Sequence, residues 1–250
     1  MSDVLLTERR GRVLVMTLNR PDQRNALNSE LADALKESLE QLDADADLTA
    51  GVITANGSNF CAGMDLKEFA TKGPPASMGP IYNQPWEKPL IGGVHGPVLA
   101  GGLELALICD LLVAAEGSSF GVPEVKRGLL AAGGALVRLP ARLPYGVAME
   151  LALTGDPIDA DAALRYGLVT KVVPQAQVLD EAVALAERIA ENAPLSIAAS
   201  KQMIRNSPGR TEAEGWAEQG PLAGKIFSSK DSIEGSVAFA EKRKPNWSGE

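Results

Sequence analysis

Short apolar runs recur along the first half of the chain and alternate with polar turns. Four of these runs carry no charged residue and are followed within two residues by Gly or Asn, a pattern typical of buried strands. They cover residues 13–18, 51–55, 89–94 and 111–115. Because helical stretches separate them without a strict sequence repeat, the pattern favours a layered α/β core with parallel crossovers.

Helical periodicity marks two other parts of the chain. After Asn28 or Ser29, either of which suits an N-cap, leucines recur on one helical face, and they are Leu31, Leu35, Leu39 and Leu42. From Leu179 onward the pattern is helical again. We therefore predict a core over residues 1–192 and a C-terminal helical region over residues 193–250, which packs on the core or on a neighbouring subunit.

The segment between Glu68 and Glu87 is rich in Gly, Pro and Ser, with Met78, Tyr82 and Trp86 scattered through it. Such a composition is typical of a mobile lid or pocket wall, and equally of a loop with a short helix of its own. The sequence leaves these alternatives open.

Bulk composition limits the class of protein. A chain of 250 residues with 45% hydrophobic side chains can bury one sizeable core, or a core with a small appendage. The net charge of -8 argues against a nucleic-acid partner, because phosphate backbones are bound by basic surfaces. The longest charge-free apolar stretch, residues 89–103, is shorter than a membrane helix. Since the N-terminus also lacks a signal-peptide pattern, we expect a cytoplasmic protein that binds no membrane.

Residues suited to metal binding or nucleophilic catalysis are few. The two cysteines, Cys61 and Cys109, and the single histidine, His95, are too few to ligate a catalytic metal. Small buried cysteines are common, so we expect Cys61 to be structural rather than a nucleophile, and His95 to support the fold. The glycines between Gly92 and Gly102 lack the G-x-G-x-x-G spacing of dinucleotide sites. We therefore expect neither a metal nor a redox cofactor.

Two glutamates carry the strongest chemical signal. Glu104 lies one helical turn after Gly101 in an otherwise apolar run, where a carboxylate is costly to bury unless it is paired, hydrogen-bonded or protonated. Glu124 follows Pro123 at a stiff turn beyond another apolar segment. Two carboxyls in different environments suit general acid/base catalysis, although each alone is also consistent with an ordinary helix or surface charge.

Two glycine-containing turns precede expected helices, at residues 61–65 and 99–102. Backbone N–H groups at helix starts are unpaired, and two that converge would form an oxyanion hole, which stabilises charge developing on a carbonyl oxygen. Glycine at such points lets a ligand approach the backbone closely. Read singly, each turn is also explained by a tight connection between elements.

Together these motifs resemble the crotonase superfamily, the family of enoyl-CoA hydratases and isomerases. The resemblance spans nearly the whole chain and rests on residues 19–28, 60–66, 96–110, 120–124, 153–156, 167–169 and 238–246. It implies an α/β fold, a spiral of ββα repeats followed by C-terminal helices that build homotrimers, often paired into homohexamers. It also implies an acyl-CoA thioester substrate, in which coenzyme A is part of the substrate rather than a separate cofactor.

By position, the resemblance also assigns roles to residues. The backbone N–H groups of Met64 and Gly101 would hold the thioester carbonyl, and Glu104 and Glu124 would be the two hydratase glutamates. Members with other activities often replace one glutamate, so the presence of both implies water addition across a 2,3-double bond. One glutamate would deprotonate the water that attacks C3, and Glu124 would protonate C2. The residues implied for the nucleotide end are Arg24, Ala26, Ala62, Asp65, Lys67 and, from a neighbouring subunit, Lys242.

One departure from the family pattern leaves the acyl group open. Ala132, in the segment 130–135, stands where close hydratases usually have Gly beside the reacting atoms. Related alternatives are a dehydratase acting on a specialised acyl-CoA, and an enoyl-CoA isomerase in which Glu124 alone moves the proton. A third is a catalytically silent acyl-CoA-binding protein, but a binder has no use for a buried carboxylate pair that costs desolvation.

Overall fold

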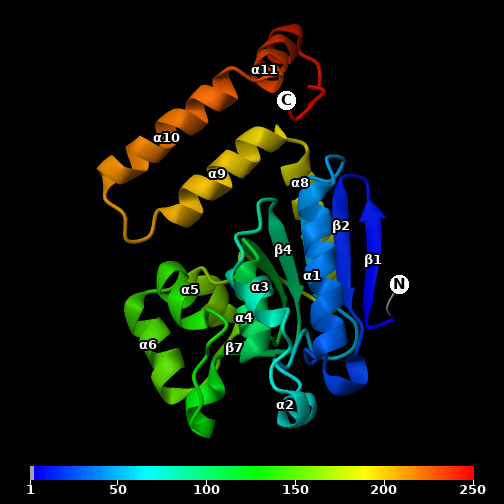
Figure 1. The fold of residues 1–250 in the computed structure, drawn as a ribbon, viewed down its shortest axis with the longest axis vertical. Helices are drawn as coiled ribbons and strands as arrows, with labels where there is room; N and C mark the ends of the chain where they lie inside the picture. The colour runs from blue at the N-terminus through cyan, green and yellow to red at the C-terminus, as the bar shows by residue number, and fades with distance from the viewer. Residues whose placement is uncertain (1–2) are drawn as a thin grey trace.

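Two β-sheets form the centre of the chain, which the computed structural model describes over residues 3–250 (Figure 1). The larger sheet has the strand order β1-β2-β3-β4-β6-β9, and the smaller has the order β5-β7-β8. The strands of the larger sheet are β1 (Leu5–Arg10), β2 (Val13–Leu18), β3 (Ala50–Ala55), β4 (Leu90–Val94), β6 (Leu111–Ala115) and β9 (Lys171–Val173). Those of the smaller sheet are β5 (Pro97–Leu99), β7 (Ser119–Gly121) and β8 (Ile158–Asp159). The mixed α/β class agrees with the prediction.

The larger sheet is buried on both faces. Its neighbouring strands pair in parallel, except that β1 pairs antiparallel with β2. Alternate residues of β2 point to different layers: Val13 and Val15 pack with α8 (Val178–Ala190), whereas Leu14 and Met16 belong to the main core. Burial on both faces explains why these strands are apolar throughout instead of alternating with polar residues.

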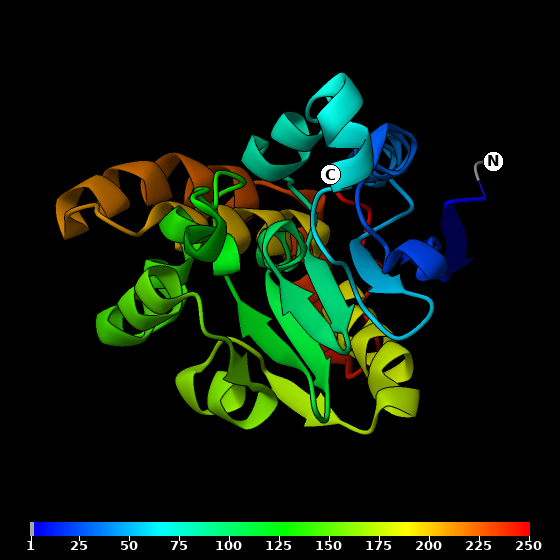
Figure 2. The ribbon, with the colours of Figure 1, turned by 90° about the horizontal axis from the view of Figure 1, so that it is seen from below.

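The helices on the main-core side begin as their sequences predict. In α1 (Ser29–Ala44), the Asn28 side chain caps the helix by accepting a hydrogen bond from the Leu31 N–H at 3.0 Å. The leucines of the predicted face are all buried, and they are Leu31, Leu35, Leu39 and Leu42. The next core helix, α4 (Gly101–Ile108), is buried on all sides. Seen from below, these two helices and α8 cover opposite faces of the sheet (Figure 2).

The four predicted strands are confirmed as β2, β3, β4 and β6. Strand β1 was not predicted, because only one of its six residues is buried and it has no apolar run. The glycine-rich turn after β4 does not lead directly into α4. The short strand β5 lies between them and pairs with β7, and its three residues beginning with Pro97 carry no strand pattern.

The segment rich in Gly, Pro and Ser forms two short helices, α2 (Leu66–Lys72) and α3 (Met78–Asn83), rather than a loop with one. Ile81 and Tyr82 of α3 are buried. Helix α3 packs against α1 and α4, so this half of the segment is a packed wall beside the helix that carries Glu104.

Three C-terminal helices extend beyond the core, at the top of Figure 1. They are α9 (Pro194–Asn206), α10 (Glu212–Phe227) and α11 (Lys230–Glu241). Lys201 fixes α9 to the core through an ion pair with Asp110 at 2.8 Å and a hydrogen bond to the Lys88 carbonyl at 2.8 Å. The remaining elements are η1 (Pro21–Gln23), η2 (Pro123–Arg127), α5 (Ala135–Arg142), α6 (Tyr145–Thr154), α7 (Ala160–Tyr166) and η3 (Gln175–Gln177). Within residues 3–250, no helix has both the length and the apolar character needed to span a bilayer.

The variant Gly102→Ala, which adds a methyl group, tests how closely α4 approaches the segment before α2. Its Cβ would lie 2.0 Å from the Cys61 carbonyl oxygen, so we expect Gly102→Ala to lower the free energy of unfolding by about 1–3 kcal/mol, as overpacking does. Gly146→Ala in α6 is the matched control, because its methyl group meets nothing within 4 Å and should be neutral or slightly stabilising. Urea unfolding measures both variants, and equal stabilities would contradict the prediction.

Candidate active site

Glu104 is held inside the core by the turn that precedes α5. Its side chain is 5% exposed and lies on the buried helix α4. The Ala135 N–H donates to its Oε1 at 3.2 Å, and the Gly133 backbone also donates to the carboxylate. A Cβ at Gly133 would lie 2.5 Å from Oε2, so only glycine lets this turn come so close. The carboxyl therefore has a fixed position.

The pKa of Glu104 is raised, mainly because burial disfavours the charged form. The negative charge of Glu124 raises it further. The hydrogen bonds from Ala135 and Gly133 and the positive charge of Arg138 act in the opposite direction. The structure therefore brings the two predicted glutamates close enough for the charge of Glu124 to act on the ionisation of Glu104.

Glu124 has a different environment. It lies in η2, directly after Pro123 at the first helical position, where the ring presets φ. Its Oε2 is buried and has no hydrogen-bond partner among residues 3–250. Burial raises the pKa of this carboxyl as well, while Arg127 partly opposes the rise. An unpaired buried carboxyl oxygen favours the protonated form.

Two backbone segments converge next to these carboxyls. Gly63 has a φ of 90°, and a Cβ there would lie 3.0 Å from the Gly101 nitrogen. A Cβ at Gly101 would in turn lie 3.4 Å from the Met64 nitrogen. Within the described part of the chain, neither the Met64 nor the Gly101 N–H donates a hydrogen bond. Two free donors thus lie side by side at the start of α4, as an oxyanion hole requires.

The backbone of Ala100 orients one of these donors. Its φ of 53° and ψ of -133° are unusual for a residue with a Cβ. Hydrogen bonds maintain this conformation. The Ala100 N–H donates to the Gly121 carbonyl at 3.0 Å, and the Ala100 carbonyl accepts from N–H groups in the first turn of α4. Strained backbone of this kind is concentrated at functional sites. No sequence signal singled out Ala100.

Tyr82 supports the same turn from α3. Its side chain is buried, and its hydroxyl donates to the Gly101 carbonyl at 3.0 Å. A Cβ at Gly101 would lie 3.3 Å from that hydroxyl. Burial raises the pKa of Tyr82 well above its ordinary value, so the phenol stays neutral beside Glu104 and Glu124.

The loop before α1 is fixed by Asn25, which is completely buried. Its Oδ1 accepts from the Arg20 N–H at 2.8 Å, and its Nδ2 donates to the carbonyls of Asn56 and Asn59, each at 2.8 Å. Asn25 belongs to the family motif at residues 19–28, in which the sequence alone indicates no role for it. Its three bonds hold three turns together, so it anchors the loop that carries two residues implied for the nucleotide end.

Four residues implied for the nucleotide end lie in one hydrogen-bonded network. The Ala62 N–H donates to the Arg24 carbonyl at 3.0 Å. The Arg20 guanidinium donates to the Ala26 carbonyl and forms an ion pair with Asp65 at 3.0 Å. Arg20, which received no role from the sequence, therefore connects the two turns.

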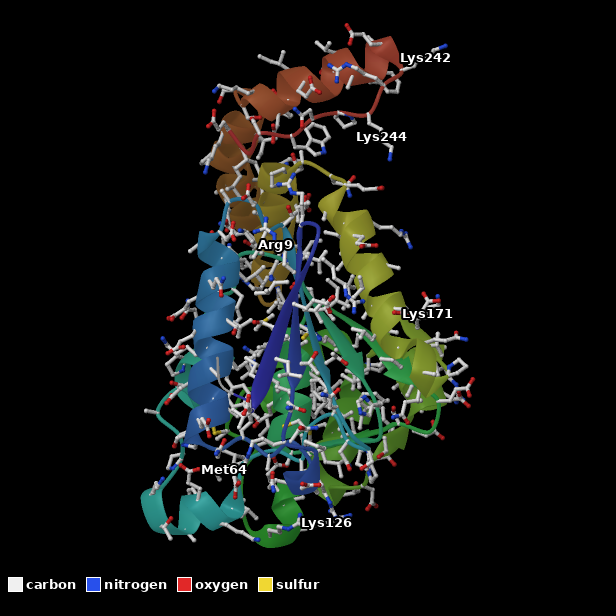
Figure 3. The ribbon with its side chains drawn as sticks, turned by 90° about the vertical axis from the view of Figure 1, so that its right-hand side faces the viewer. Arg9, Met64, Lys126, Lys171, Lys242 and Lys244 are labelled. Carbon is white, nitrogen blue, oxygen red and sulfur yellow. The ribbon has the colours of Figure 1, made fainter. Side chains whose placement is uncertain are left out.

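Asp65 also caps α2, and its Oδ1 accepts from the Lys67 N–H at 3.1 Å. Although burial opposes it, the hydrogen bond from Arg20 and those from the helix N-terminus lower the pKa of Asp65. The side chain of Lys67 is exposed in the same region. Lys242, by contrast, lies at the opposite end of the molecule from Met64 (Figure 3). Within a single chain it is not part of this site, and its contribution to a neighbour's site stays a prediction.

The remaining residues singled out by the sequence have ordinary environments. Cys61 is buried, and burial raises its pKa to about 12, which leaves an unreactive thiol. His95 forms a hydrogen bond through Nε2 to the Gly57 carbonyl at 3.1 Å, and burial lowers its pKa. The burial of Cys61 and the hydrogen bond of His95 both fit roles in supporting the fold. Ala132 is exposed and is the neighbour of Gly133 in the turn that holds Glu104.

Comparison with known proteins places this geometry in a family. The profile of the Enoyl-CoA hydratase/isomerase family matches residues 8–250. The chain is 41% identical over 254 residues to the enoyl-CoA hydratase EchA19 of Mycobacterium tuberculosis, with 97% of this chain and 95% of that protein covered. It is 38% identical over 263 residues to a carnitinyl-CoA dehydratase of Salmonella paratyphi A, with both covered completely.

A solved structure extends the comparison to the fold. The crystal structure of an enoyl-CoA hydratase from Mycobacterium tuberculosis H37Rv superposes with a TM-score of 0.94 at 46% sequence identity, and the match covers 100% of each chain. This likeness confirms the predicted crotonase-like α/β fold.

Because the Glu124 pKa is raised, the stability of the chain should depend on its ionisation. A carboxyl with a raised pKa in the folded state binds its proton more tightly there, so the free energy of unfolding falls as the pH rises from about 4.3, its unfolded pKa, through the folded value. Glu124→Gln cannot lose a proton. The stability of this variant relative to the parent should therefore grow with pH across that window and stay constant below it.

Urea unfolding at several pH values checks this prediction. Glu150→Gln, which removes an exposed carboxylate from α6, serves as the control and should show no comparable gain. Parallel stability curves for the parent and Glu124→Gln would contradict the raised pKa.

Proposed function

This chain belongs to the enoyl-CoA hydratase/isomerase family, and we propose that it is a hydratase that adds water across the 2,3-double bond of a 2-enoyl-CoA thioester. The observation that carries the proposal is a pair of glutamates in two different environments, Glu104 buried and Glu124 half-buried, near two free backbone donors. Hydration needs these functions: a base for water, an acid for C2, and donors for the thioester oxygen.

Glu104 is the base in this proposal. The N–H groups of Ala135 and Gly133 and the charge of Arg138 favour its ionised form against the effect of burial. An ionised carboxylate in a fixed position can orient a water molecule and take its proton as the water oxygen attacks C3. The fixed turn around Glu104 thus serves positioning as well as charge.

Glu124 is the acid. Burial and the unpaired Oε2 favour its protonated form, which can give a proton to C2 as the C3–O bond forms. The hydroxyl group from water is then bonded to C3, and the proton from Glu124 is bonded to C2. Glu104 is left protonated and Glu124 ionised, and proton exchange with solvent restores the starting state.

The N–H groups of Met64 and Gly101 would bind the thioester oxygen. Attack at C3 moves electron density through the conjugated system onto that oxygen, and two preorganised donors stabilise the enolate that develops. Glycine at position 101 leaves space for the carbonyl, since a side chain there would come within 3.4 Å of the Met64 nitrogen. We assign the network formed by Arg24, Ala26, Ala62 and Asp65, together with Lys67, to the nucleotide end of coenzyme A. In this proposal coenzyme A is part of the substrate, and no separate cofactor takes part.

A dehydratase acting on a specialised acyl-CoA is the second candidate, because the chain is 38% identical over its full length to a carnitinyl-CoA dehydratase. The same acid and base would act in reverse. An isomerase or a silent binder is less well supported, since neither needs two carboxyls in this arrangement. The cytoplasmic location stays a prediction from the sequence.

We also propose that the C-terminal helices assemble three or six copies of the chain. Large apolar side chains on these helices are exposed in one chain: Trp216 is 62%, Phe227 79% and Phe239 87% exposed. Apolar surface of this extent is typical of an interaction site. Assembly would also let Lys242 approach a neighbour's site, as the resemblance implies.

Native mass spectrometry should find a trimer or hexamer of the 26.2 kDa chain. Phe239→Ser should shift the distribution toward smaller species, because it removes exposed apolar area from α11. Phe69→Ser on α2, at 43% exposure, is the control outside the C-terminal region. A monomeric parent protein would contradict the proposed assembly.

The function is tested by the loss of conjugated enoyl-thioester absorbance with crotonyl-CoA and longer 2-enoyl-CoAs. We expect Glu104→Gln and Glu124→Gln each to lower kcat by at least about 100-fold, since each removes one proton transfer. Glu150→Gln, outside the site, should retain parent activity. Incorporation of 18O from labelled water into the product distinguishes hydration from isomerisation. An active parent whose product contains no 18O would exclude the hydratase.

A further inference from the structure

Arg138 is a half-buried cation to which the family resemblance assigns no role, and whose contacts the proposed mechanism leaves unexplained. From α5, its Nη1 donates to the Gly133 carbonyl at 3.2 Å, and its Nη2 donates to the Tyr82 carbonyl. Among the described residues, no carboxylate lies within ion-pair distance of it. Burying a guanidinium without an ion pair is unfavourable, and burial indeed lowers the pKa of Arg138. Such a cost suggests a function.

The two carbonyls that Arg138 binds belong to two different parts of the site. Gly133 lies in the turn whose N–H groups hold Glu104. Tyr82 lies in α3, and its hydroxyl binds the Gly101 carbonyl at the first residue of α4. The planar guanidinium therefore connects the support of the general base with the support of one oxyanion donor. Lysine cannot make this connection in the same way, because it lacks the fixed fork of donors.

The turn is shaped around the guanidinium. Gly134 has a φ of 105°, which side chains with a Cβ rarely adopt, and a Cβ there would lie 2.2 Å from Arg138 Nη1. A Cβ at the preceding Gly133 would lie 2.5 Å from Glu104 Oε2. The two consecutive glycines thus let the same turn contact the arginine on one side and the glutamate on the other.

Few charged groups act on Glu104. From η2, Glu124 raises its pKa, and from α5, Arg138 lowers it. From α3, Tyr82 is neutral, because burial raises its pKa well above its ordinary value. Farther out, Arg127 acts on Glu124, and Arg142 acts on Arg138. Arg138 is therefore the cation, within residues 3–250, that favours the ionised form of Glu104.

We propose that Arg138 is a positioning residue, which holds Glu104 in place by tying the turn 133–135 to α3. This inference rests on the proposed function for its kinetic part alone. The contacts of Arg138 with the turn and with α3 do not depend on which reaction the site performs.

Arg142 provides a matched control on the same helix, one turn later. It is also a partly buried arginine, and it donates to two carbonyls, those of Leu107 at 3.1 Å and Cys109 at 2.6 Å. These carbonyls are at the far end of α4 from Gly101. Loss of Arg142 should therefore affect stability as loss of Arg138 does, without changing Glu104.

The kinetic test compares Arg138→Gln, Arg138→Lys and Arg142→Gln. For Arg138→Gln we expect kcat to fall about 10- to 100-fold with little change in KM, because the base is misplaced while binding contacts remain. Glu104 must be ionised to accept a proton, so removal of the cation should move the acidic limb of the kcat profile to higher pH. Arg138→Lys should return the acidic limb of the kcat profile to the pH of the parent but should not restore the full kcat. Lysine keeps the positive charge and lacks the planar set of donors.

A measurement independent of activity separates this proposal from the hydratase assignment. Infrared difference spectra against Glu104→Gln follow the protonated carboxyl of Glu104 as the pH changes. Arg138→Gln should move this titration to higher pH, and Arg142→Gln should leave it unchanged. If the parent lacks hydratase activity but the titration moves, the positioning role stands and the proposed function fails. If Arg138→Gln does not fold, Arg138→Lys should still lower kcat while the acidic limb of its kcat profile stays at the pH of the parent. A Glu104 titration unaffected by Arg138→Gln, or full activity in Arg138→Lys, would overturn the proposal.

Discussion

The site and much of the core depend on one close approach between two stretches of backbone. The start of α4 comes so near the segment before α2 that a methyl group on Gly102 would lie 2.0 Å from the Cys61 carbonyl oxygen. One on Gly63 would lie 3.0 Å from the Gly101 nitrogen. Any larger residue would separate the two stretches, and with them the free N–H groups of Met64 and Gly101. The same approach brings the apolar helix α4 into the centre of the molecule.

That approach also determines where Glu104 must lie. A carboxyl on the first turn of a buried helix destabilises the fold, because burial opposes its charge. The structure offsets this with local donors from the turn 133–135 and with the charge of Arg138. Glu124 receives less compensation, since its Oε2 has no partner within the described chain. The fold thus holds two carboxyls in different environments at a cost in stability, as is common at functional sites.

Sequence patterns were sufficient to predict an element wherever its burial is determined by residues close to one another in the chain. The run 13–18 and the leucines of α1 belong to this class, because period and capping are local properties. The family motifs were enough to indicate both glutamates and both glycine turns. The pattern could not indicate Arg138, whose bond to the Tyr82 carbonyl joins residues 56 positions apart. Nor could it indicate Ala100, since its positive φ is imposed by tertiary contacts rather than by its own preference.

Strand β1 carries a consequence for how copies of the chain can meet. It is the outer strand of the larger sheet, its residues Glu8 and Arg9 are exposed, and Arg10 is half-buried. Arg9 pairs with Asp45 at 3.4 Å, and Arg10 pairs with Glu8 at 3.0 Å. Charged edge strands resist the addition of a further strand from another molecule. Open-ended sheet growth is therefore disfavoured at this edge, and a concentrated solution of the protein is protected from one common route to fibres.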